Sequence, residues 1–164
     1  MEAYKKLLES RAKIRFQDCD PFNHLNNSRY IDYFVDARGD QLIEHYGFDI
    51  YKYAREYGLG WVSAQTQISY LSPAQLMEEV VIQTRLIACS EKSLLMEAQM
   101  WDLHKNNIKA VMWTKLVHFN LSTQRSHQHA EELMLFFRQF VYPLDTAMNF
   151  EERVMHLRRL PLEK

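Results

Sequence analysis

Two aspartates near the start of the chain, Asp18 and Asp20, are the residues whose type and spacing best suit chemistry. A carboxylate placed here could attack an acyl carbonyl, or it could deprotonate a water molecule that attacks instead. Asn26 and Asn27 follow a few residues later and can cap the start of a helix. The N–H groups and positive end of that helix would stabilise a developing oxyanion. This short segment therefore contains both parts that acyl transfer requires.

A thioester is the acyl bond that suits such a site. Its leaving thiol has a pKa of about 8.5, so departure needs little help from a general acid and one carboxylate can suffice. His24, four residues after Asp20, could orient the carboxylate, hold a water molecule or protonate the thiolate. The sequence leaves open whether Asp20 is the nucleophile or the general base.

The two aspartates also have simpler interpretations, because aspartate often ends a strand or caps a helix. We assign this turn-forming role to Asp18 and the chemistry to Asp20. A calcium loop does not fit, since its sixth position would be Asn23 instead of glycine and its twelfth would be Arg29 instead of glutamate. We therefore expect no metal and no other cofactor.

The elements on either side must position this segment. Alternating apolar and basic residues over 11–17 predict a half-buried strand that ends at the aspartates. Over residues 28–46, polar side chains recur at every fourth position within a broad apolar surface. This pattern predicts a long helix that is largely enclosed by other structure. Gly47 suits its C-terminal end.

Strand patterns dominate the rest of the chain, with little helical signal between them. We predict strands over residues 61–70, 80–88, 94–101 and 108–119, and a last helix over 127–140. The links at 89–92 and 104–107 are short enough for antiparallel turns. The order predicts an α+β fold: a five-stranded antiparallel sheet wrapped around a long central helix, plus a C-terminal helix.

These elements form one expected domain over residues 1–145, followed by a C-terminal tail over 146–164, part of which can be helical. An open sheet has edge strands that need cover, and pairing of two protomers is a common solution. We therefore expect a homodimer or a homotetramer. His118, on the inward side of its strand, is expected to be a core histidine with satisfied hydrogen bonds.

The segment between the first strand and the long helix resembles the 4-hydroxybenzoyl-CoA thioesterase branch of the hot-dog superfamily. It reads Asp18-x-Asp20-x-x-x-His24-x-Asn26-Asn27-x-x-Tyr30. The resemblance covers residues 11–140 and implies a hot-dog fold and hydrolysis of an acyl-CoA to the free acid and CoA. It also implies that Asp20 is the essential carboxylate and that the backbone N–H of Asn27 is the oxyanion donor.

The predicted site follows from this resemblance. Its catalytic residues are Asp20, His24 and Asn27, and its substrate-binding residues are Asn23 and Tyr30. In the related plant acyl-carrier-protein thioesterases an asparagine lies two residues after the aspartate, a position that is Phe22 here. Asn23 therefore receives no catalytic role. A tyrosine at the position of Tyr30, one turn into the helix, is more often a core residue than a substrate contact.

Composition limits the partners. Lysine plus arginine (20) nearly balance aspartate plus glutamate (21), so no broad basic face favours nucleic acid or a membrane surface. The charged start lacks the apolar region of a signal peptide, and no apolar run approaches the ~20 residues of a membrane span. Cys19 lies between two carboxylates, which oppose thiolate formation. We expect a cytoplasmic protein that acts on a small substrate.

Two other functions remain open from the sequence. Acyl-carrier-protein thioesterase activity would break the same bond, although an acidic carrier favours a basic docking patch that the net charge of −1 does not indicate. A non-catalytic acyl-CoA-binding protein could share the fold, but it would not need the carboxylate and polar loop that are present. The identity of the acyl group is not predicted.

Overall fold

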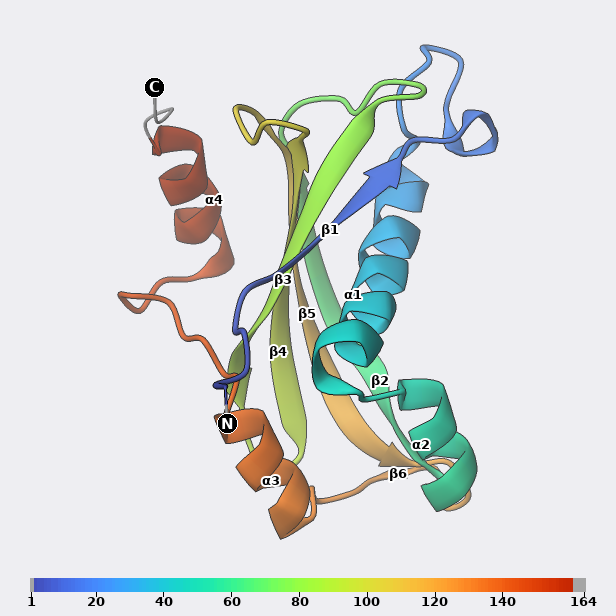
Figure 1. Cartoon of the computed structure of the whole chain (residues 1–164), viewed down its shortest axis with the longest axis vertical. Helices are drawn as coiled ribbons and strands as arrows, with labels where there is room; N and C mark the ends of the chain where they lie inside the picture. Colours follow the sequence, from blue (N-terminus) through green and yellow to red (C-terminus); the bar gives the residue numbers. More distant parts are fainter. Residues whose placement is uncertain (1, 161–164) are drawn as a thin grey trace.

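The computed structural model describes residues 2–160 and shows a curled sheet with α1 (Tyr30–Tyr46) against its concave face (Figure 1). The helix α4 (Phe150–Arg159) covers the opposite face. Two shorter helices, α2 (Ile50–Tyr57) and α3 (Glu131–Arg138), lie at the end of the sheet away from the loop that precedes α1. The sheet is therefore covered on both sides.

Five long strands and one short strand make up the sheet. They are β1 (Leu8–Lys13), β2 (Leu59–Tyr70), β3 (Glu79–Cys89), β4 (Ser93–Asp102), β5 (Ile108–Asn120) and β6 (Arg125–Ser126). The order across the sheet is β1-β3-β4-β5-β2, all neighbours are antiparallel, and β6 pairs with the end of β5. The predicted α+β architecture, with five main strands around a central helix, is confirmed.

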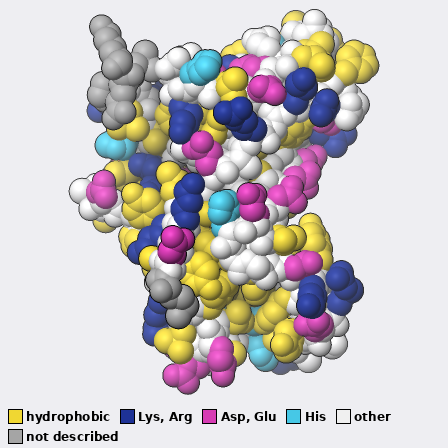
Figure 2. Space-filling view, in the orientation of Figure 1, with side chains coloured by type: hydrophobic (Ala, Val, Ile, Leu, Met, Phe, Trp, Pro, Cys, Tyr) yellow, Lys and Arg dark blue, Asp and Glu magenta, His cyan; other side chains and the backbone are white. Residues whose placement is uncertain are grey.

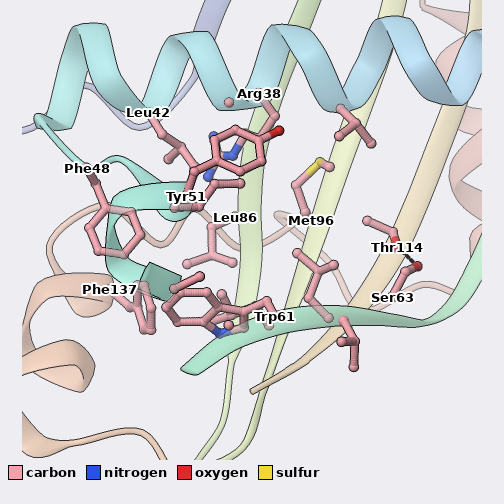
Figure 3. A pocket seen from close by; sticks show the side chains of 18 of the residues that line it. Arg38, Leu42, Phe48, Tyr51, Trp61, Ser63, Leu86, Met96, Thr114 and Phe137 are labelled. Atoms are coloured by element: carbon pink, nitrogen blue, oxygen red, sulfur yellow. Dashed lines mark hydrogen bonds between the residues drawn. The ribbon is translucent and has the colours of Figure 1, made fainter. Parts of the chain in front are cut away.

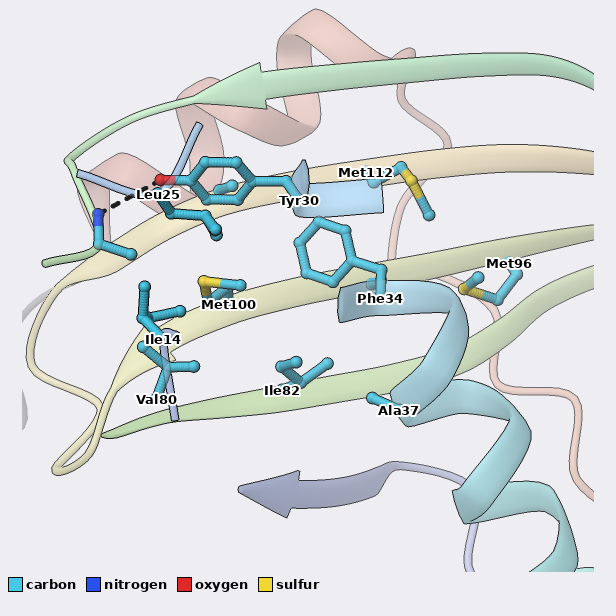
Figure 4. Close-up of a cluster of buried hydrophobic side chains, with 13 residues drawn as sticks. Ile14, Leu25, Tyr30, Phe34, Ala37, Val80, Ile82, Met96, Met100 and Met112 are labelled. Carbon is cyan, nitrogen blue, oxygen red and sulfur yellow. Dashed lines mark hydrogen bonds between the residues drawn. The ribbon is translucent and has the colours of Figure 1, made fainter. Parts of the chain in front are cut away.

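Alternation along the strands divides the core into two layers, because successive side chains point to opposite faces of a sheet. Ile82 of β3 and Met112 of β5 face α1 and pack with Phe34 (Figure 4). The neighbouring Trp113 faces the other way and packs with Phe150 of α4. The central strands β3, β4 and β5 therefore contribute apolar side chains to both layers.

Three faces of α1 have different surroundings. One is buried in the core and consists of Tyr30, Phe34, Ala37 and Gln41. One is acidic and exposed, and it consists of Asp32, Asp36, Asp40 and Glu44 (Figure 2). The third lines a cavity and includes Ile31, Val35, Arg38 and Leu42. The predicted long helix is confirmed, and it ends at Gly47, which has a φ of 64°.

The first strand lies earlier in the chain than predicted. It spans Leu8–Lys13 instead of residues 11–17, because its partner β3 begins at Glu79, which pairs with Lys13. Beyond that point the chain forms a single 3-10 turn, η1 (Phe16–Asp18). Phe16 is 76% exposed, so the alternation that predicted a longer strand does not continue into the core.

The helices also differ from the prediction in two places. Helix α2 was missed, although Asp49 caps it by accepting hydrogen bonds from two backbone N–H groups and Gly58 ends it with a φ of 65°. Helix α3 is shorter than residues 127–140, because His127 still donates its N–H to the carbonyl of His118. Across the described residues, no helix has both the length and the apolar character needed to cross a membrane.

A buried ion-pair network fastens α4 to the sheet. Arg153 of α4 contacts both carboxylate oxygens of Glu97 on β4, each at 2.9 Å. Trp113 donates to the same carboxylate at 2.8 Å, and Arg85 lies 3.3 Å from it. Burial alone would raise the pKa of Glu97, but Arg153 and its other partners hold that pKa below its usual value. The carboxylate is therefore ionised and shared between two arginines.

Candidate active site

The loop between η1 and α1 is closed by its own backbone. Asp20 donates its N–H to the carbonyl of His24 at 2.8 Å, and Asn23 donates to the carbonyl of Asp20 at 3.1 Å. Asn23 has a φ of 62°, a left-handed conformation that asparagine tolerates better than most residues. Leu25 is buried and donates to the carbonyl of Ala74, which ties the loop to the β2–β3 connection. The loop is a defined turn that holds Asp20 in place.

The two carboxylate oxygens of Asp20 have different surroundings. Its Oδ1 accepts hydrogen bonds from the backbone N–H of Phe22 at 2.9 Å and of His24 at 3.2 Å. Within residues 2–160, no donor contacts its Oδ2. One oxygen is thus anchored, which fixes the orientation of the carboxylate, while the other is available to react.

Asp18 is engaged differently. Its Oδ2 accepts a 2.7 Å hydrogen bond from the Tyr33 hydroxyl, and that hydroxyl accepts one from the backbone N–H of Arg15 at 3.1 Å. Burial, reinforced by the Asp18 charge, raises the pKa of Tyr33 to about 12, so Tyr33 stays a donor. The guanidinium of Arg29 lies 4.0 Å from the same carboxylate. These contacts brace the loop against α1, which agrees with a turn-forming role.

A 3-10 turn, η2 (Asn27–Arg29), leads directly into α1. Asn26 caps it by accepting from the backbone N–H of Ser28 at 3.0 Å and from its hydroxyl at 2.8 Å. The carbonyl of Asn27 accepts a 2.9 Å hydrogen bond from the hydroxyl of Tyr70 on β2. No acceptor among the described residues contacts the Asn27 N–H. Asn27 is therefore held at its carbonyl, and its N–H is a free donor at the helix start.

His24 and Asn23, also predicted for the site, lie on the same loop. His24 is partly buried, and its backbone exchanges hydrogen bonds with Asp20, while its ring has no hydrogen bond to a described residue. Asn23 is exposed, and its carbonyl accepts from the N–H of Leu76. Hydrogen bonds from and to the His24 backbone therefore hold this residue next to Asp20.

Tyr30 lies beneath the loop. It is 2% exposed, and its hydroxyl accepts a 3.2 Å hydrogen bond from the N–H of Ala74 (Figure 4). Its ring packs edge to face against Tyr70, with centroids 5.2 Å apart. Tyr30 and Tyr70 therefore support the two sides of the helix start, and a direct contact between Tyr30 and substrate remains a prediction.

A cavity of about 440 Å³ extends along the third face of α1 (Figure 3). Its wall is mostly apolar and includes Val35, Leu42 and Phe137. A small polar patch consists of Ser63, Thr66 and Thr114, whose hydroxyls lie 2.9 to 3.1 Å from one another. The size and lining are typical of a site for a small organic ligand.

Sequence reasoning did not find this cavity, because its wall comes from α1, α2, α3 and four strands. A local signal existed on α1, where Ile31 and Val35 are one turn apart and both remain exposed (38% and 44%). The irregular pairing of β2 with β5 near Ser63 also marks this region, since bulges often redirect side chains toward a site, but it is visible only in the structure. In the described part of the chain, no three His, Cys, Asp or Glu side chains are arranged to hold a metal.

The fold and the loop together define a hot-dog protein of the thioesterase type. Residues 14–156 match the sequence profile of the Thioesterase-like superfamily, and the chain belongs to this superfamily. The predicted resemblance is thereby confirmed, and membership supports thioester hydrolysis as the general activity.

The chain is similar to one curated thioesterase in sequence and to two solved structures in fold. The chain is 24% identical to the long-chain acyl-CoA thioesterase FadM of Escherichia coli over 119 residues, which are 73% of this chain and 88% of FadM. The crystal structure of YbaW, a probable thioesterase from Escherichia coli, superposes with a TM-score of 0.70 at 24% identity, over 82% of this chain and 99% of that one. SAV2348 from Staphylococcus aureus, solved in complex with CoA, superposes with a TM-score of 0.74 at 14% identity, over 93% and 95% of the two chains.

Proposed function

We propose that this protein hydrolyses an acyl-CoA to the free acid and CoA, with Asp20 as the reacting carboxylate. One observation carries the proposal: Asp20 Oδ1 is fixed by two backbone N–H groups, whereas Oδ2 has no described partner. The open N–H of Asn27 at the helix start supplies the oxyanion donor on the same loop. FadM and the CoA complex of SAV2348 support CoA as the carrier.

Two routes use this geometry. In the first, Asp20 Oδ2 attacks the thioester carbon, the C–S bond breaks, CoA leaves as a thiolate, and water then hydrolyses the mixed anhydride. In the second, Asp20 takes a proton from a water molecule whose oxygen attacks the same carbon. In both routes the carbonyl oxygen gains negative charge and accepts from the Asn27 N–H.

His24, Asn23 and Tyr30 have supporting roles in this proposal. The backbone N–H of His24 holds Asp20, and its ring, free of described hydrogen bonds, can deliver a proton to the departing thiolate. Asn23 is exposed on the loop, which would allow it to contact the part of CoA nearest the thioester. Tyr30 supports the loop from below.

The cavity along α1 is the proposed acyl site. It begins at Ile31, close to the helix start, and continues past Val35 toward α3. The exposed apolar side chains at its mouth and the unpaired edge of β2 favour a homodimer or a homotetramer, because a second copy would cover both.

The deciding experiment is a thiol-release assay over short, medium, long and aromatic acyl-CoAs. We expect the substitution Asp20→Asn to preserve folding and to lower kcat by ~100- to 10,000-fold. Asp36→Asn, an exposed position on the acidic face of α1, is the matched control and should retain full activity. Wild-type turnover by Asp20→Asn across every substrate that the parent cleaves would overturn the proposal.

A further inference from the structure

Arg38 is a cation on the apolar wall of the cavity. It projects from α1 toward the space above Leu86 of β3 (Figure 3). Val35 and Leu42, its neighbours on the same helix face, are both apolar. Because a guanidinium loses hydration in such surroundings, burial lowers the pKa of Arg38 to about 10, and it remains charged near neutral pH.

A polar network behind the cavity wall holds the guanidinium. Arg38 Nη1 donates to the hydroxyl of Thr84 on β3 at 2.9 Å. That hydroxyl donates its proton to Gln41 Oε1, so its lone pair is left to accept from Arg38. Gln41 in turn donates to Ser10 at 2.8 Å and to the carbonyl of Ile82 at 3.2 Å. Thr84 and Gln41 are fully buried, so they fix the position of the arginine.

No carboxylate in the described part of the chain forms an ion pair with Arg38. Three other cationic side chains of low exposure do have acidic partners. The side chains of Arg85, Arg153 and Lys109 are each 11% exposed, and each lies within ion-pairing distance of a glutamate. A guanidinium has five N–H donors, and only one of those on Arg38 contacts a described acceptor.

Apolar ligand sites usually contain a few polar groups that fix orientation and provide specificity. A partly buried cation that lacks a counter-ion loses hydration, and a ligand that brings an anion to it recovers part of the lost interaction. We propose that Arg38 binds a carboxylate on the acyl group, so that the preferred substrate class is an acyl-CoA derived from a dicarboxylic acid. This inference rests on the proposed thioesterase function and names its substrate class.

The position of Arg38 along the cavity determines the chain length of the dicarboxylic acid. Arg38 lies two turns beyond Ile31, about 10 Å along the axis of α1. The carboxylate must therefore be separated from the thioester by several carbons. Val35 lies between Ile31 and Arg38 on α1 and lines the cavity, so its apolar side chain can contact the methylene chain.

The test compares matched pairs of substrates. The pairs are succinyl- with butyryl-CoA, adipoyl- with hexanoyl-CoA, and suberoyl- with octanoyl-CoA. At the best chain length we expect kcat/KM to favour the carboxylate by ~10- to 100-fold, the usual effect of a charge-assisted hydrogen bond. Arg38→Met should reduce that ratio to about one or below, whereas Arg55→Met, an exposed arginine of α2, should leave it unchanged.

Measuring the binding of non-hydrolysable analogues distinguishes failure of this inference from failure of the thioesterase proposal. Thioether analogues cannot be hydrolysed, so calorimetry with S-octyl-CoA and S-(carboxyheptyl)-CoA measures recognition without turnover. The inference would be supported if S-(carboxyheptyl)-CoA bound more tightly than S-octyl-CoA and Arg38→Met abolished that difference, even if no substrate were cleaved. Hydrolysis without discrimination, or discrimination that survives Arg38→Met, would overturn it.

Thermal unfolding of the free protein provides a third readout. If Arg38 awaits a ligand, Arg38→Met removes an uncompensated charge, and Tm should stay level or rise. A carboxylate from a second copy that pairs with Arg38 would instead make Arg38→Met lower Tm and weaken self-association, which would contradict the inference.

Discussion

The hydroxyl of Tyr33 donates a 2.7 Å hydrogen bond to Asp18 Oδ2 and thereby joins the loop that contains Asp20 to the first turns of α1. Tyr33→Phe removes this link. We expect the free energy of unfolding to fall by about 1 to 2 kcal/mol, as measured by urea denaturation. We also expect a several-fold decrease in kcat, because the loop is less well positioned but Asp20 is still present. A loss of kcat as large as that of Asp20→Asn would contradict this division of roles.

The two aspartates are predicted to respond differently to the same change. In Asp18→Asn the amide oxygen can still accept from Tyr33, so kcat should remain within about 10-fold of the parent. In Asp20→Asn the oxygen that we propose to react is replaced, and turnover should be lost. Single-turnover kinetics of both variants on one substrate would compare them directly. Equal losses in the two variants would mean that the carboxylates act as a pair.

Glu97 should be among the residues most important for stability. The substitution Glu97→Gln leaves Arg85 and Arg153 buried without their shared anion. We expect the free energy of unfolding to fall by about 3 kcal/mol or more. The exposed Glu56→Gln, in a surface pair with Lys52, should change it by less than about 1 kcal/mol. Similar effects of the two substitutions would show that the Glu97 network contributes little.

Acidification should destabilise the fold through two buried histidines. His129 accepts from the Trp61 indole at 3.0 Å, and His118 is 3.1 Å from the hydroxyl of Tyr53. The second ring nitrogen of each histidine faces a backbone carbonyl, to which it donates. His129 is therefore neutral, and His118 is fully bonded as a neutral ring. Burial lowers the pKa of both below the ordinary value of 6.5.

The sign of the pH effect follows from these lowered values. The unfolded chain binds protons on both histidines below about pH 6.5, while the folded protein does not, so stability is present above that pH and is lost as pH falls. Urea denaturation should show the decline in the free energy of unfolding between about pH 7.5 and 5, roughly the range over which histidine titrates. His118→Asn should flatten it, and substitution of the exposed His104 by Gln should not. A parent protein with constant stability over this range would contradict the assignment of neutral rings.

His118 was expected to be a satisfied core histidine, and this is confirmed: it is fully buried and both ring nitrogens have partners. The pattern that predicted it is local, since alternation along one strand decides which side chains point inward. Its particular partners, Tyr53 and His127, come from other segments and could not be derived in the same way.

The helix α1 and the inward faces of the strands could be predicted from the sequence, because the patterns that determine them are local. The spacing of polar residues predicted α1, Gly47 predicted its end, and alternation predicted the inward faces of the strands. The loop around Asp20 also depends mainly on its own residues, because the hydrogen bonds that orient Asp20 come from Phe22 and His24.

Tertiary structure alone decided the features that depend on segments far apart in the chain. The end of β1 depends on where β3 begins, the Glu97 network requires α4 to lie across β4, and the cavity exists only where α1, β2 and α3 meet. Arg38 is an ordinary helix residue in the sequence. It becomes a cation facing an apolar cavity because Thr84, on a strand 46 residues away, holds its guanidinium there.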